Sequence, residues 1–476
     1  MAVSENVLSS IARRLTGNEV YMSSKRATFI LLILAFSCLV QPASLLAQQP
    51  SQTTKPDVSQ PVASPPNPSG AVVLTQETSE SKPLFGVQGV LVETLDGRII
   101  ATQNADQLFN PASAVKLATA LIALRTFGPQ HRFTTGFWTD GTLDKASGII
   151  TGNLYISGRD PSLHYEQAVD IARQLNLTGI KKVTGDLIVA PSFTLNFNWS
   201  AKRSAEQFYD TLDAELRTSE ATSAWFSARI ALGDKSSPVI IPTVSVMGNV
   251  VVGPVAPGAK LLLSYSSSRL TDILKVLLCY SNNFMAERLG ESLGGVDSVQ
   301  RQLATLLGVS NDQIHLSSVS GLGVNRVTPQ VMMKVLRALR GEVEKVGLKL
   351  SDIMPVAGVD PGTLEERFTA PPWRGSVIAK TGTLARTDGG ASSLVGQMRT
   401  TSGEILLFVI MNQNGNVTRF RENQDMFVMQ IQTSRGGPRA FDYVPLTLAI
   451  KLTDTKSSVG SGDEYEPKTT AVSPSP

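Results

Sequence analysis

Three short motifs in the sequence combine hydroxyl, amine and amide side chains in a way that suits nucleophilic catalysis. In chain order they are Ser113-x-x-Lys116, Ser281-x-Asn283 and Lys380-Thr381-Gly382-Thr383. A serine hydroxyl is a weak nucleophile until a base takes its proton, and a lysine whose pKa is lowered by burial or by a second cation can be that base. Together the motifs predict acyl transfer through a serine.

Each motif taken alone is weak evidence. The S-x-x-K spacing recurs at Ser79 and Lys82 in a polar stretch, and another S-x-N begins at Ser4. Serine is a preferred N-cap residue and lysine is common in helices, so Ser113 and Lys116 also fit a helix cap followed by a solvated lysine. K-T-G occurs once. The order of the motifs, and the kind of element in which each falls, favour the catalytic interpretation.

The histidines offer no recognisable alternative base. The chain has three, His131, His164 and His315, and none lies in a nucleophile-elbow sequence. A Ser-His-Asp mechanism would have to use one of them. If the protein is a serine hydrolase, we therefore expect its base to be another kind of residue.

Composition argues against several other classes of function. The 43 basic and 40 acidic residues give a net charge of +3 and are spread along the chain, so we expect no basic face for nucleic acid. Of the two cysteines, Cys38 lies in a predicted leader, and the mature chain would keep only Cys279. A disulfide within that chain is then impossible, and we expect neither a metal site nor a cofactor.

The two ends of the chain have the composition of unstructured segments. Basic residues precede an apolar run at residues 29–40 and small residues follow it, which predicts a signal sequence over residues 1–47, with Met22 as an alternative start. The run is short for a transmembrane helix. Residues 48–82 and 452–476 are polar and rich in Pro, Ser and Thr, which predicts a disordered linker and a disordered tail. The leader predicts export to the periplasm or another extracytoplasmic space.

The elements around the first motif follow from periodicity and turn residues. Two alternating segments flank Asp96-Gly97, a residue pair typical of a tight hairpin. Residues 114–124 are nearly all apolar helix formers, which predicts a buried helix with Ser113 at its N-terminus. There the unpaired backbone N–H groups and the helix field suit an oxyanion.

Beyond this helix the pattern indicates a second domain and then a return to the first. Residues 129–262 hold short strand-like segments with two amphipathic helices, near residues 166–175 and 204–217. Helical sequence with a break at Ser281 follows, and residues 376–413 read as three antiparallel strands. We therefore predict an α+β fold, in which both ends of the folded chain contribute to one helix-covered sheet.

With its motifs in this order, the chain resembles the D-alanyl-D-alanine carboxypeptidase/endopeptidase family, the low-molecular-mass class C penicillin-binding proteins. Further segments that carry the resemblance are FNPASAVKLATALIAL, TGNLYISGRDPSL, VTGDLIV, SGLGVNRVTP and MPVAGVDPGTLEERF. The resemblance implies the penicillin-binding/serine β-lactamase-like transpeptidase fold, an antiparallel sheet with helices. Residues 83–128 and 263–451 would form this catalytic domain, and residues 129–262 would be an inserted β-rich domain. Residues 318–322 read SVSGL where relatives usually have Asp-Gly-Ser-Gly-Leu.

The motif residues divide into two groups by expected role. The predicted catalytic residues are Ser113, Lys116, Ser281 and Lys380, and the predicted substrate-binding residues are Asn283, Thr381, Gly382 and Thr383. Lys116, one helical turn after Ser113, would be the base, with its pKa lowered by desolvation and by the Lys380 cation. Ser281 would relay a proton between the lysines and the leaving amine.

The second group would hold an extended substrate. Asn283 suits the substrate's peptide group, and Gly382 would let the substrate approach the strand that carries the third motif closely. Thr381 and Thr383 would bind a terminal carboxylate. The resemblance implies that the backbone N–H groups of Ser113 and Thr383 form the oxyanion hole.

The expected function is that of a serine-type D-Ala-D-Ala carboxypeptidase/endopeptidase. Its substrates would be peptidoglycan stem peptides, and β-lactams would acylate it as covalent inhibitors. A serine β-lactamase or esterase on a related fold is an alternative, but the sequence shows no acidic loop of the class A kind. An inactive wall-binding protein is another, although Ser113, Lys116 and Lys380 are all present. The balance of carboxypeptidase and endopeptidase action and the oligomeric state stay open.

Overall fold

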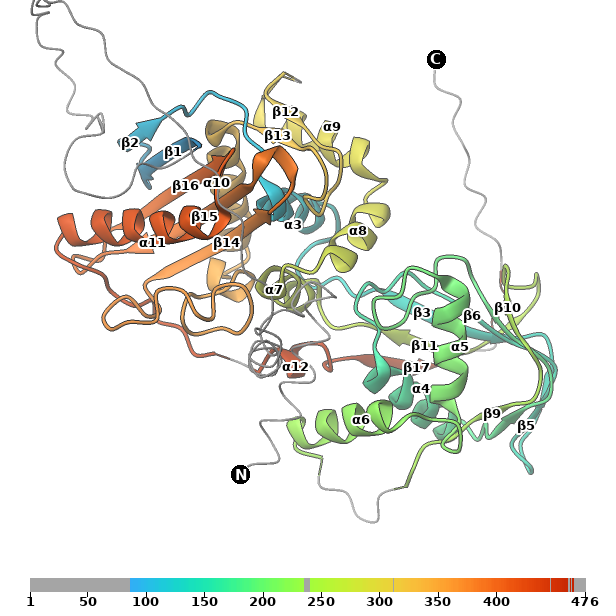
Figure 1. The fold of residues 1–476 in the computed structure, drawn as a ribbon. Coiled ribbons are helices and arrows are strands. Elements are labelled where there is room, and N and C mark those ends of the chain that lie inside the picture. The colour runs from blue at the N-terminus through green and yellow to red at the C-terminus, as the bar shows by residue number, and fades with distance from the viewer. Residues whose placement is uncertain are drawn as a thin grey trace, which may run out of the picture. The chain divides into compact units, whose positions relative to one another are not determined.

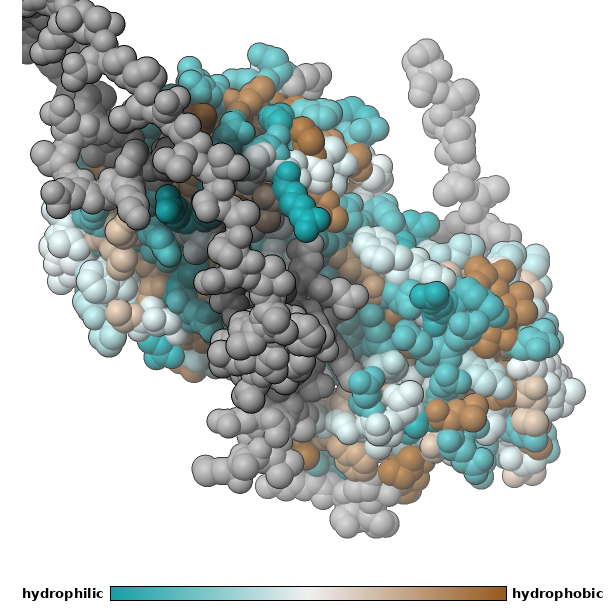
Figure 2. All heavy atoms as spheres, in the orientation of Figure 1, coloured by the Kyte–Doolittle hydropathy of each residue, from teal (hydrophilic) through white to brown (hydrophobic). Residues whose placement is uncertain are grey.

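The computed structural model describes residues 86–234, 240–310, 312–445 and 447–460, together with Asp463 and Tyr465 (Figure 1). The predicted leader and linker lie outside these residues. Within the described part of the chain, no helix is both long enough and apolar enough to cross a membrane. On the face in Figure 2, hydrophilic side chains cover most of the described surface, and hydrophobic ones lie among them in small groups.

A five-stranded antiparallel sheet forms the centre of the region that carries all three motifs. Its strands are β1 (Val87–Thr94), β2 (Ile99–Gln103), β14 (Val377–Leu384), β15 (Ala391–Arg399) and β16 (Ile405–Gln413). The order across the sheet is β14-β15-β16-β1-β2, so β14 lies at one edge. The hairpin predicted around Asp96-Gly97 and the three predicted C-terminal strands are confirmed. As expected, both ends of the folded chain build one sheet.

Helices cover both faces of this sheet (Figure 1). They are α3 (Lys116–Phe127), α7 (Leu270–Tyr280), α8 (Asn283–Ser292), α9 (Val296–Leu307), α10 (Pro329–Lys345) and α11 (Val417–Ser434). Side chains alternate along β16: Leu407 and Val409 pack into the core that contains α3, α7 and α10, whereas Phe408 packs with Val428 of α11 on the other face. The same alternation assigns the side chains of β14 to opposite faces.

The helix of the first motif begins later than the sequence predicts. Residues Ala112–Val115 form a 3₁₀ turn, η1, and α3 starts only at Lys116. Ser113 therefore lies inside this turn, and the N-cap position of α3 is taken by Val115. The turn begins with Ala112 at φ 46°, a left-handed conformation that is costly for a residue with a Cβ. The nucleophile candidate thus follows a strained residue.

The inserted region has its own sheets and its own hydrophobic core. Its strands are β3 (Thr134–Thr139), β4 (Thr142–Asp144), β5 (Ile149–Thr151), β6 (Leu154–Ser157), β7 (Lys182–Val183), β8 (Leu187–Val189), β9 (Ser245–Val246), β10 (Val250–Val252) and β11 (Lys260–Ser266). The strand β17 (Lys456–Val459), from near the C-terminus, joins one of the sheets. Six of them pair in the order β10-β8-β6-β3-β11-β17 and four in the order β4-β5-β7-β9. Phe137, Phe193 and Phe208 lie in the core beneath them.

Two helices of this region match the prediction only in part. Helix α4 (Tyr165–Leu177) corresponds to the segment near residues 166–175, but the helix expected over residues 204–217 is α5 (Ala201–Leu212). It ends because Asp213 takes an extended conformation, and a further helix, α6 (Ser219–Ala231), follows after Thr218 caps it. The predicted helix therefore included both the end of α5 and the turn that follows it.

The structure also differs from the predicted boundaries. Strand β11 pairs with β3, so the inserted region's sheet continues to Ser266, beyond the expected boundary at residue 262. Strand β17 pairs with β11 inside the stretch expected to be a disordered tail. Strand pairing uses backbone groups, so a short polar segment such as KSSV can join a sheet edge that hydrophobic patterning does not reveal. The remaining short elements are β12 (Ile314–His315), β13 (Arg326–Val327), η2 (Leu350–Asp352), η3 (Thr387–Gly389) and α12 (Leu448–Lys451).

Candidate active site

The fold brings the three motifs together through their lysines. The Nζ atom of Lys116 lies 3.0 Å from Ser113 Oγ and 2.7 Å from Asn283 Oδ1, which joins the first motif to the second. The Nζ atom of Lys380 lies 2.8 Å from Ser281 Oγ, which joins the third motif to the second. Both lysine side chains are fully buried, whereas Ser113, Ser281 and Asn283 are partly exposed. Each amine therefore meets a hydroxyl group that solvent can reach.

The amine of Lys116 lies among oxygen atoms of three different segments. Besides Ser113, its Nζ atom contacts Asn283 Oδ1 and, at 2.5 Å, the carbonyl oxygen of Ser320, and both of these oxygens can only accept hydrogen bonds. In the structure the amine also donates to Ser113 Oγ. Removal of the Ser113 proton by Lys116 would require the amine first to lose a proton, so that its lone pair can face the hydroxyl.

Lys380 lies in an environment that disfavours its charge. Its Nζ atom donates to the Thr381 carbonyl oxygen at 2.7 Å and contacts Ser281 Oγ, and no carboxylate of the described residues pairs with it. Burial lowers the pKa of Lys380 to about 7, because desolvation penalises the ammonium form. The sequence predicts that Lys380 acts on Lys116 as a cation. With a pKa of about 7, Lys380 can also gain and lose a proton near neutral pH.

The second motif owes its geometry to a tight connection between α7 and α8. Ser281 ends α7 in the left-handed conformation, with φ 55°, and Asn282 then caps α8 by accepting a hydrogen bond from the Met285 N–H at 2.9 Å. Because Asn282 serves as the cap, the Asn283 side chain can accept from Lys116. The left-handed turn costs about 1–3 kcal/mol for a residue other than glycine, and such strain is concentrated at functional sites.

Two glycines allow the other segments to approach the turn that carries Ser113. A Cβ on Gly382 would lie 2.4 Å from the carbonyl oxygen of Pro111, and one on Gly321 would lie 2.0 Å from that of Ala112. The Ser393 hydroxyl also donates to the Pro111 carbonyl oxygen at 2.6 Å. From the sequence, Gly382 is expected to allow close approach of the substrate. In the structure its lack of a side chain lets β14 contact the nucleophile's own turn.

A polar network that the sequence did not reveal supports the turn that carries Ser113. The Asn110 side chain accepts a hydrogen bond from the Ala112 N–H at 3.0 Å and donates to Asp388 Oδ2 at 2.8 Å. Arg326 donates to both oxygens of Asp388. Burial alone would raise the pKa of Asp388, but the hydrogen bonds from Arg326 and Asn110 outweigh it and lower that pKa. The carboxylate thus stays charged and fixes Asn110 beneath Ala112.

The SVSGL segment at residues 318–322 forms a turn that is held by the Ser318 side chain. Ser318 Oγ accepts a hydrogen bond from the Gly321 N–H at 3.0 Å and donates to the Leu322 carbonyl oxygen at 2.8 Å. The Ser320 N–H donates to Glu287 of α8 at 2.9 Å. The Ser320 carbonyl oxygen is thereby placed beside Lys116. This carbonyl is a functional contact that side-chain motifs cannot indicate.

The outer end of β14 carries the last two predicted site residues. Thr381 is nearly buried and Thr383 is partly exposed, and the alternation of the strand places both on the α11 face of the sheet, opposite to Lys380. Arg421 of α11 donates from Nη2 to Thr383 Oγ1 at 2.8 Å. Sequence reasoning missed Arg421, since it lies in a polar helical stretch with no motif around it.

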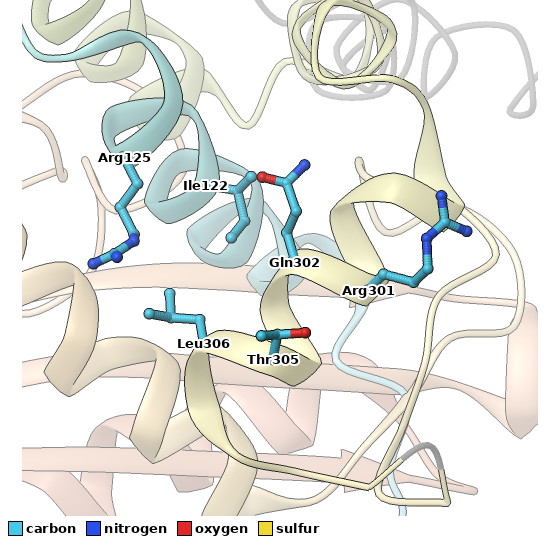
Figure 3. Close-up of a pocket in the computed structure, with 6 residues that line it drawn as sticks. All are labelled: Ile122, Arg125, Arg301, Gln302, Thr305 and Leu306. Carbon is cyan, nitrogen blue, oxygen red and sulfur yellow. The ribbon is translucent and has the colours of Figure 1, made fainter. Parts of the chain in front are cut away.

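A separate surface pocket contains none of the motif residues. Its cavity of about 380 Å³ lies between α3 and α9, and it is lined by Ile122, Arg125, Arg301, Gln302, Thr305 and Leu306. Figure 3 shows that the side chains of Arg125 and Arg301 point away from each other, and Arg125 pairs with Glu342. The two guanidinium groups therefore do not converge on a common point of this pocket.

The sheet covered by helices and the three motifs around one centre define the class of penicillin-binding serine peptidases, with a mixed α+β fold. The chain belongs to the D-Ala-D-Ala carboxypeptidase 3 (S13) family, whose model matches residues 75–211 and 242–433. The predicted family and fold class are thereby confirmed. Of the hypotheses that the sequence raised, the family supports the peptidase.

Two curated relatives and one solved structure illustrate the similarity. The D-alanyl-D-alanine carboxypeptidase DacB of Haemophilus influenzae is 24% identical over 72% of this chain and 88% of its own length. A D-alanyl-D-alanine carboxypeptidase of Actinomadura sp. strain R39 is 26% identical over 68% of this chain and 77% of its own. The penicillin G-acylated predatory endopeptidase Bd3459 of Bdellovibrio bacteriovorus, solved with an immunity protein, covers 77% of this chain and 97% of its own, with a TM-score of 0.64 and 24% identity.

Proposed function

We propose that this protein hydrolyses the terminal D-Ala-D-Ala bond, or the corresponding cross-link bond, of peptidoglycan stem peptides through an acyl-Ser113 intermediate. The observation that carries the proposal is the arrangement at Lys116, whose amine contacts two acceptor-only oxygens and the Ser113 hydroxyl. The family supports the reaction type. The assignment of these particular residues to catalysis is our own.

In the acylation step, Lys116 takes the proton of Ser113 as Oγ attacks the carbonyl carbon of the penultimate D-Ala. The backbone N–H groups of Ser113 and Thr383 would stabilise the oxyanion, a contribution that is typically about two to three orders of magnitude in rate for each donor. The C–N bond then breaks, and the leaving amine must gain a proton. Ser281 is placed to deliver it, since its hydroxyl contacts Lys380, whose pKa near 7 allows it to supply a proton to Ser281 in turn.

In the deacylation step, water replaces the departed amine. A water molecule gives its proton to the same lysine–serine system while its oxygen attacks the acyl carbon, and the bond to Ser113 Oγ breaks with return of a proton to the serine. A β-lactam would acylate Ser113 in the same way as in the first step, through cleavage of its own amide bond. Because its ring-opened amine remains attached and occupies the water's position, we expect the penicilloyl enzyme to persist.

The proposal includes an extracytoplasmic location. Two observations support this location. The chain begins with a basic and apolar leader, and two curated relatives are named D-alanyl-D-alanine carboxypeptidases, after a peptide of the cell wall. Fractionation of cells that express the full chain tests this: we expect a shortened form outside the cytoplasm. Retention of an uncleaved chain in the cytoplasm would contradict it.

Release of D-Ala from a stem pentapeptide tests the proposed reaction. We expect wild-type protein to release one D-Ala per peptide and Ser113→Ala to release none above background. Ser79→Ala is a matched control, because Ser79 begins the other S-x-x-K sequence of the chain. Equal release by wild type and Ser113→Ala, or loss of release in Ser79→Ala alone, would refute the assignment. A cross-linked dimer offered separately measures endopeptidase action.

A further inference from the structure

Two residues in the left-handed conformation lie on separate segments near the nucleophile, and a single side chain joins them. Ala112, directly before Ser113, has φ 46°, and Asp388, between β14 and β15, has φ 53°. The conformation is costly for alanine, whereas aspartate tolerates it better because its side chain can form local hydrogen bonds. The side chain of Asn110 bonds to both residues. The strained backbone at Ala112 therefore depends on contacts with the segment that contains Asp388.

The hydrogen bonds of Asn110 fix the orientation of its amide group. Its Oδ1 atom accepts from the Ala112 N–H at 3.0 Å. Its Nδ2 atom donates to Asp388 Oδ2 at 2.8 Å and to the Gly323 carbonyl oxygen at 3.0 Å. The first partner can only donate and the other two can only accept, so a flipped amide would lose all of these bonds. Because the Asn110 side chain is fully buried, such a loss is expensive, and the amide holds the Ala112 N–H in one position.

Arg326 supplies the positive charge that keeps the Asp388 carboxylate in place. It belongs to β13 and donates from Nη1 to Oδ2 at 3.0 Å and from Nη2 to Oδ1 at 2.7 Å, which is a bidentate arrangement. The two side chains are 29% and 17% exposed, so water screens this pair less than an ion pair on the open surface. Strand β13 is itself joined to the segment before Asn110, because Phe109 and Val327 exchange both backbone hydrogen bonds. The network thus connects three segments to the turn that carries the nucleophile.

We propose that the carboxylate of Asp388 is a positioning group for Ser113. It acts through Asn110, which holds the strained backbone of Ala112, and Arg326 fixes the carboxylate in turn. This inference rests on the proposed function and adds to it residues that lie outside the three motifs. The conformation of Ala112 orients the peptide group that bears the Ser113 N–H, which is one of the two donors proposed for the oxyanion. When the network is broken, Ala112 relaxes toward an ordinary conformation, and the N–H group and the hydroxyl of Ser113 both move.

Acylation kinetics separate positioning from general structural support. The probe is benzylpenicillin, and the acylation rate constant and the dissociation constant of the complex that precedes acylation are measured for wild type, Asp388→Asn and Glu404→Gln. Asparagine also tolerates the left-handed conformation, but it cannot accept hydrogen bonds with both side-chain atoms. We expect Asp388→Asn to acylate about ten- to hundredfold more slowly, with little change in the dissociation constant, since small misplacements of reacting groups affect the rate most. An unchanged rate constant, or a loss confined to the dissociation constant, would overturn the proposal.

Glu404 provides the matched control. Both of its carboxylate oxygens accept from Arg435, and it lies in the turn at the other end of β15 from Asp388. Removal of this charge disturbs a comparable ion pair on the same strand without touching the turn that carries Ser113. Glu404→Gln should therefore acylate at the wild-type rate. A loss equal to that in Asp388→Asn would show that the effect is general and would contradict a specific role of Asp388.

Glycine at position 112 tests whether the strained backbone carries the effect. Glycine adopts a positive φ without the penalty that a Cβ brings, so the turn would depend less on the network. The loss caused by Asp388→Asn should then shrink to a few-fold when it is measured relative to Ala112→Gly rather than to wild type. An equal loss in both backgrounds would show that Asp388 does not act through Ala112 and would overturn the proposed path.

The same samples distinguish a failure of this inference from a failure of the proposed function. Absence of D-Ala release by a wild type that penicillin acylates would refute the proposed function alone, whereas an unchanged acylation rate in Asp388→Asn would refute the role of Asp388. Thermal unfolding verifies that each variant is folded. If Asp388→Asn does not fold, Arg326→Lys serves instead, because it keeps the charge without the bidentate fork. Slower acylation at an unchanged dissociation constant would support the proposal there, and a wild-type rate would overturn it.

Discussion

Two fully buried lysines, Lys275 and Lys380, differ in the groups that surround their amines. Lys275 of α7 lies 2.6 Å from Asp360 Oδ2 and donates to two backbone carbonyl oxygens. The other carboxylate oxygen of Asp360 accepts from the Tyr443 hydroxyl at 2.7 Å. Every charge in this cluster is compensated. Lys380, by contrast, has a hydroxyl and a carbonyl as its neighbours.

The difference lies in what the lysine can do with its proton. The Lys275 amine and the Asp360 carboxylate link α7 to the segment around Asp360 through an ion pair. Without such a partner, burial lowers the pKa of Lys380 to about 7. The first arrangement holds α7, whose C-terminal end carries Ser281, and the second places an amine with a lowered pKa beside the Ser281 hydroxyl. The comparison teaches that a buried lysine without a carboxylate partner is a candidate for catalysis.

Replacement of Lys380 should have the largest effect on activity. In Lys380→Met we expect acylation by benzylpenicillin to slow by about 10²- to 10⁴-fold, the usual contribution of a proton-transfer group. The melting temperature should rise at neutral pH, since a buried, unpaired amine is replaced by an apolar chain of similar length. Stopped-flow acylation and calorimetry measure the two effects. A variant that is slower and also less stable would indicate that Lys380 is structural, like Lys275.

Replacement of Asp360 should have the opposite effect: it should lower stability strongly and change the acylation rate little. Asp360→Asn leaves the Lys275 ammonium buried without its counter-charge, which typically costs about 3–5 kcal/mol of unfolding free energy. At low temperature, where the variant is still folded, Ser113 should acylate within a few-fold of the wild-type rate. Denaturant unfolding and penicillin labelling of the same sample provide the comparison. Tyr443→Phe, which removes a single hydrogen bond to Asp360, should cost about 1 kcal/mol.

The pH dependence of stability tests the lowered pKa of Lys380. The folded-state pKa of Lys380 is about 7 and lies below the ordinary value of about 10.4 in the unfolded chain. Between these values the unfolded chain binds a proton that the folded protein lacks, so stability rises with pH in this window and falls as pH is lowered toward 7. The unfolding free energy of wild type, taken relative to Lys380→Met, should therefore increase by roughly 2 kcal/mol from pH 7 to pH 9. A flat difference would contradict the lowered pKa.

The sequence predicted those parts of the site that local pattern encodes. The edge strand with Lys380, the buried helix after Ser113 and the helix break at Ser281 all follow from periodicity and turn residues, and the structure has them. The order of the three motifs then indicated the family. Local pattern was sufficient because each motif falls at the end of one element.

The contacts made between distant elements could not be predicted in this way. Arg421 of helix α11 reaches Thr383 of strand β14. Asn110 is held beneath the turn that carries Ser113 by Asp388, nearly 280 residues later in the chain. The Ser320 carbonyl acts through the backbone. The strand β17 joins its sheet by backbone pairing alone, which leaves no hydrophobic pattern. These features depend on tertiary packing, and no local sequence signal marks them.

Mass spectrometry after incubation with benzylpenicillin tests the central claim most directly. We expect the intact protein to gain the mass of one penicillin molecule, and the added mass to be found on the tryptic peptide of residues 99–116, which carries Ser113. Ser113→Ala should show no added mass under the same conditions, while Ser79→Ala should label fully. Labelling that persists in Ser113→Ala, or that maps to any other peptide, would contradict the assignment of Ser113 as the nucleophile.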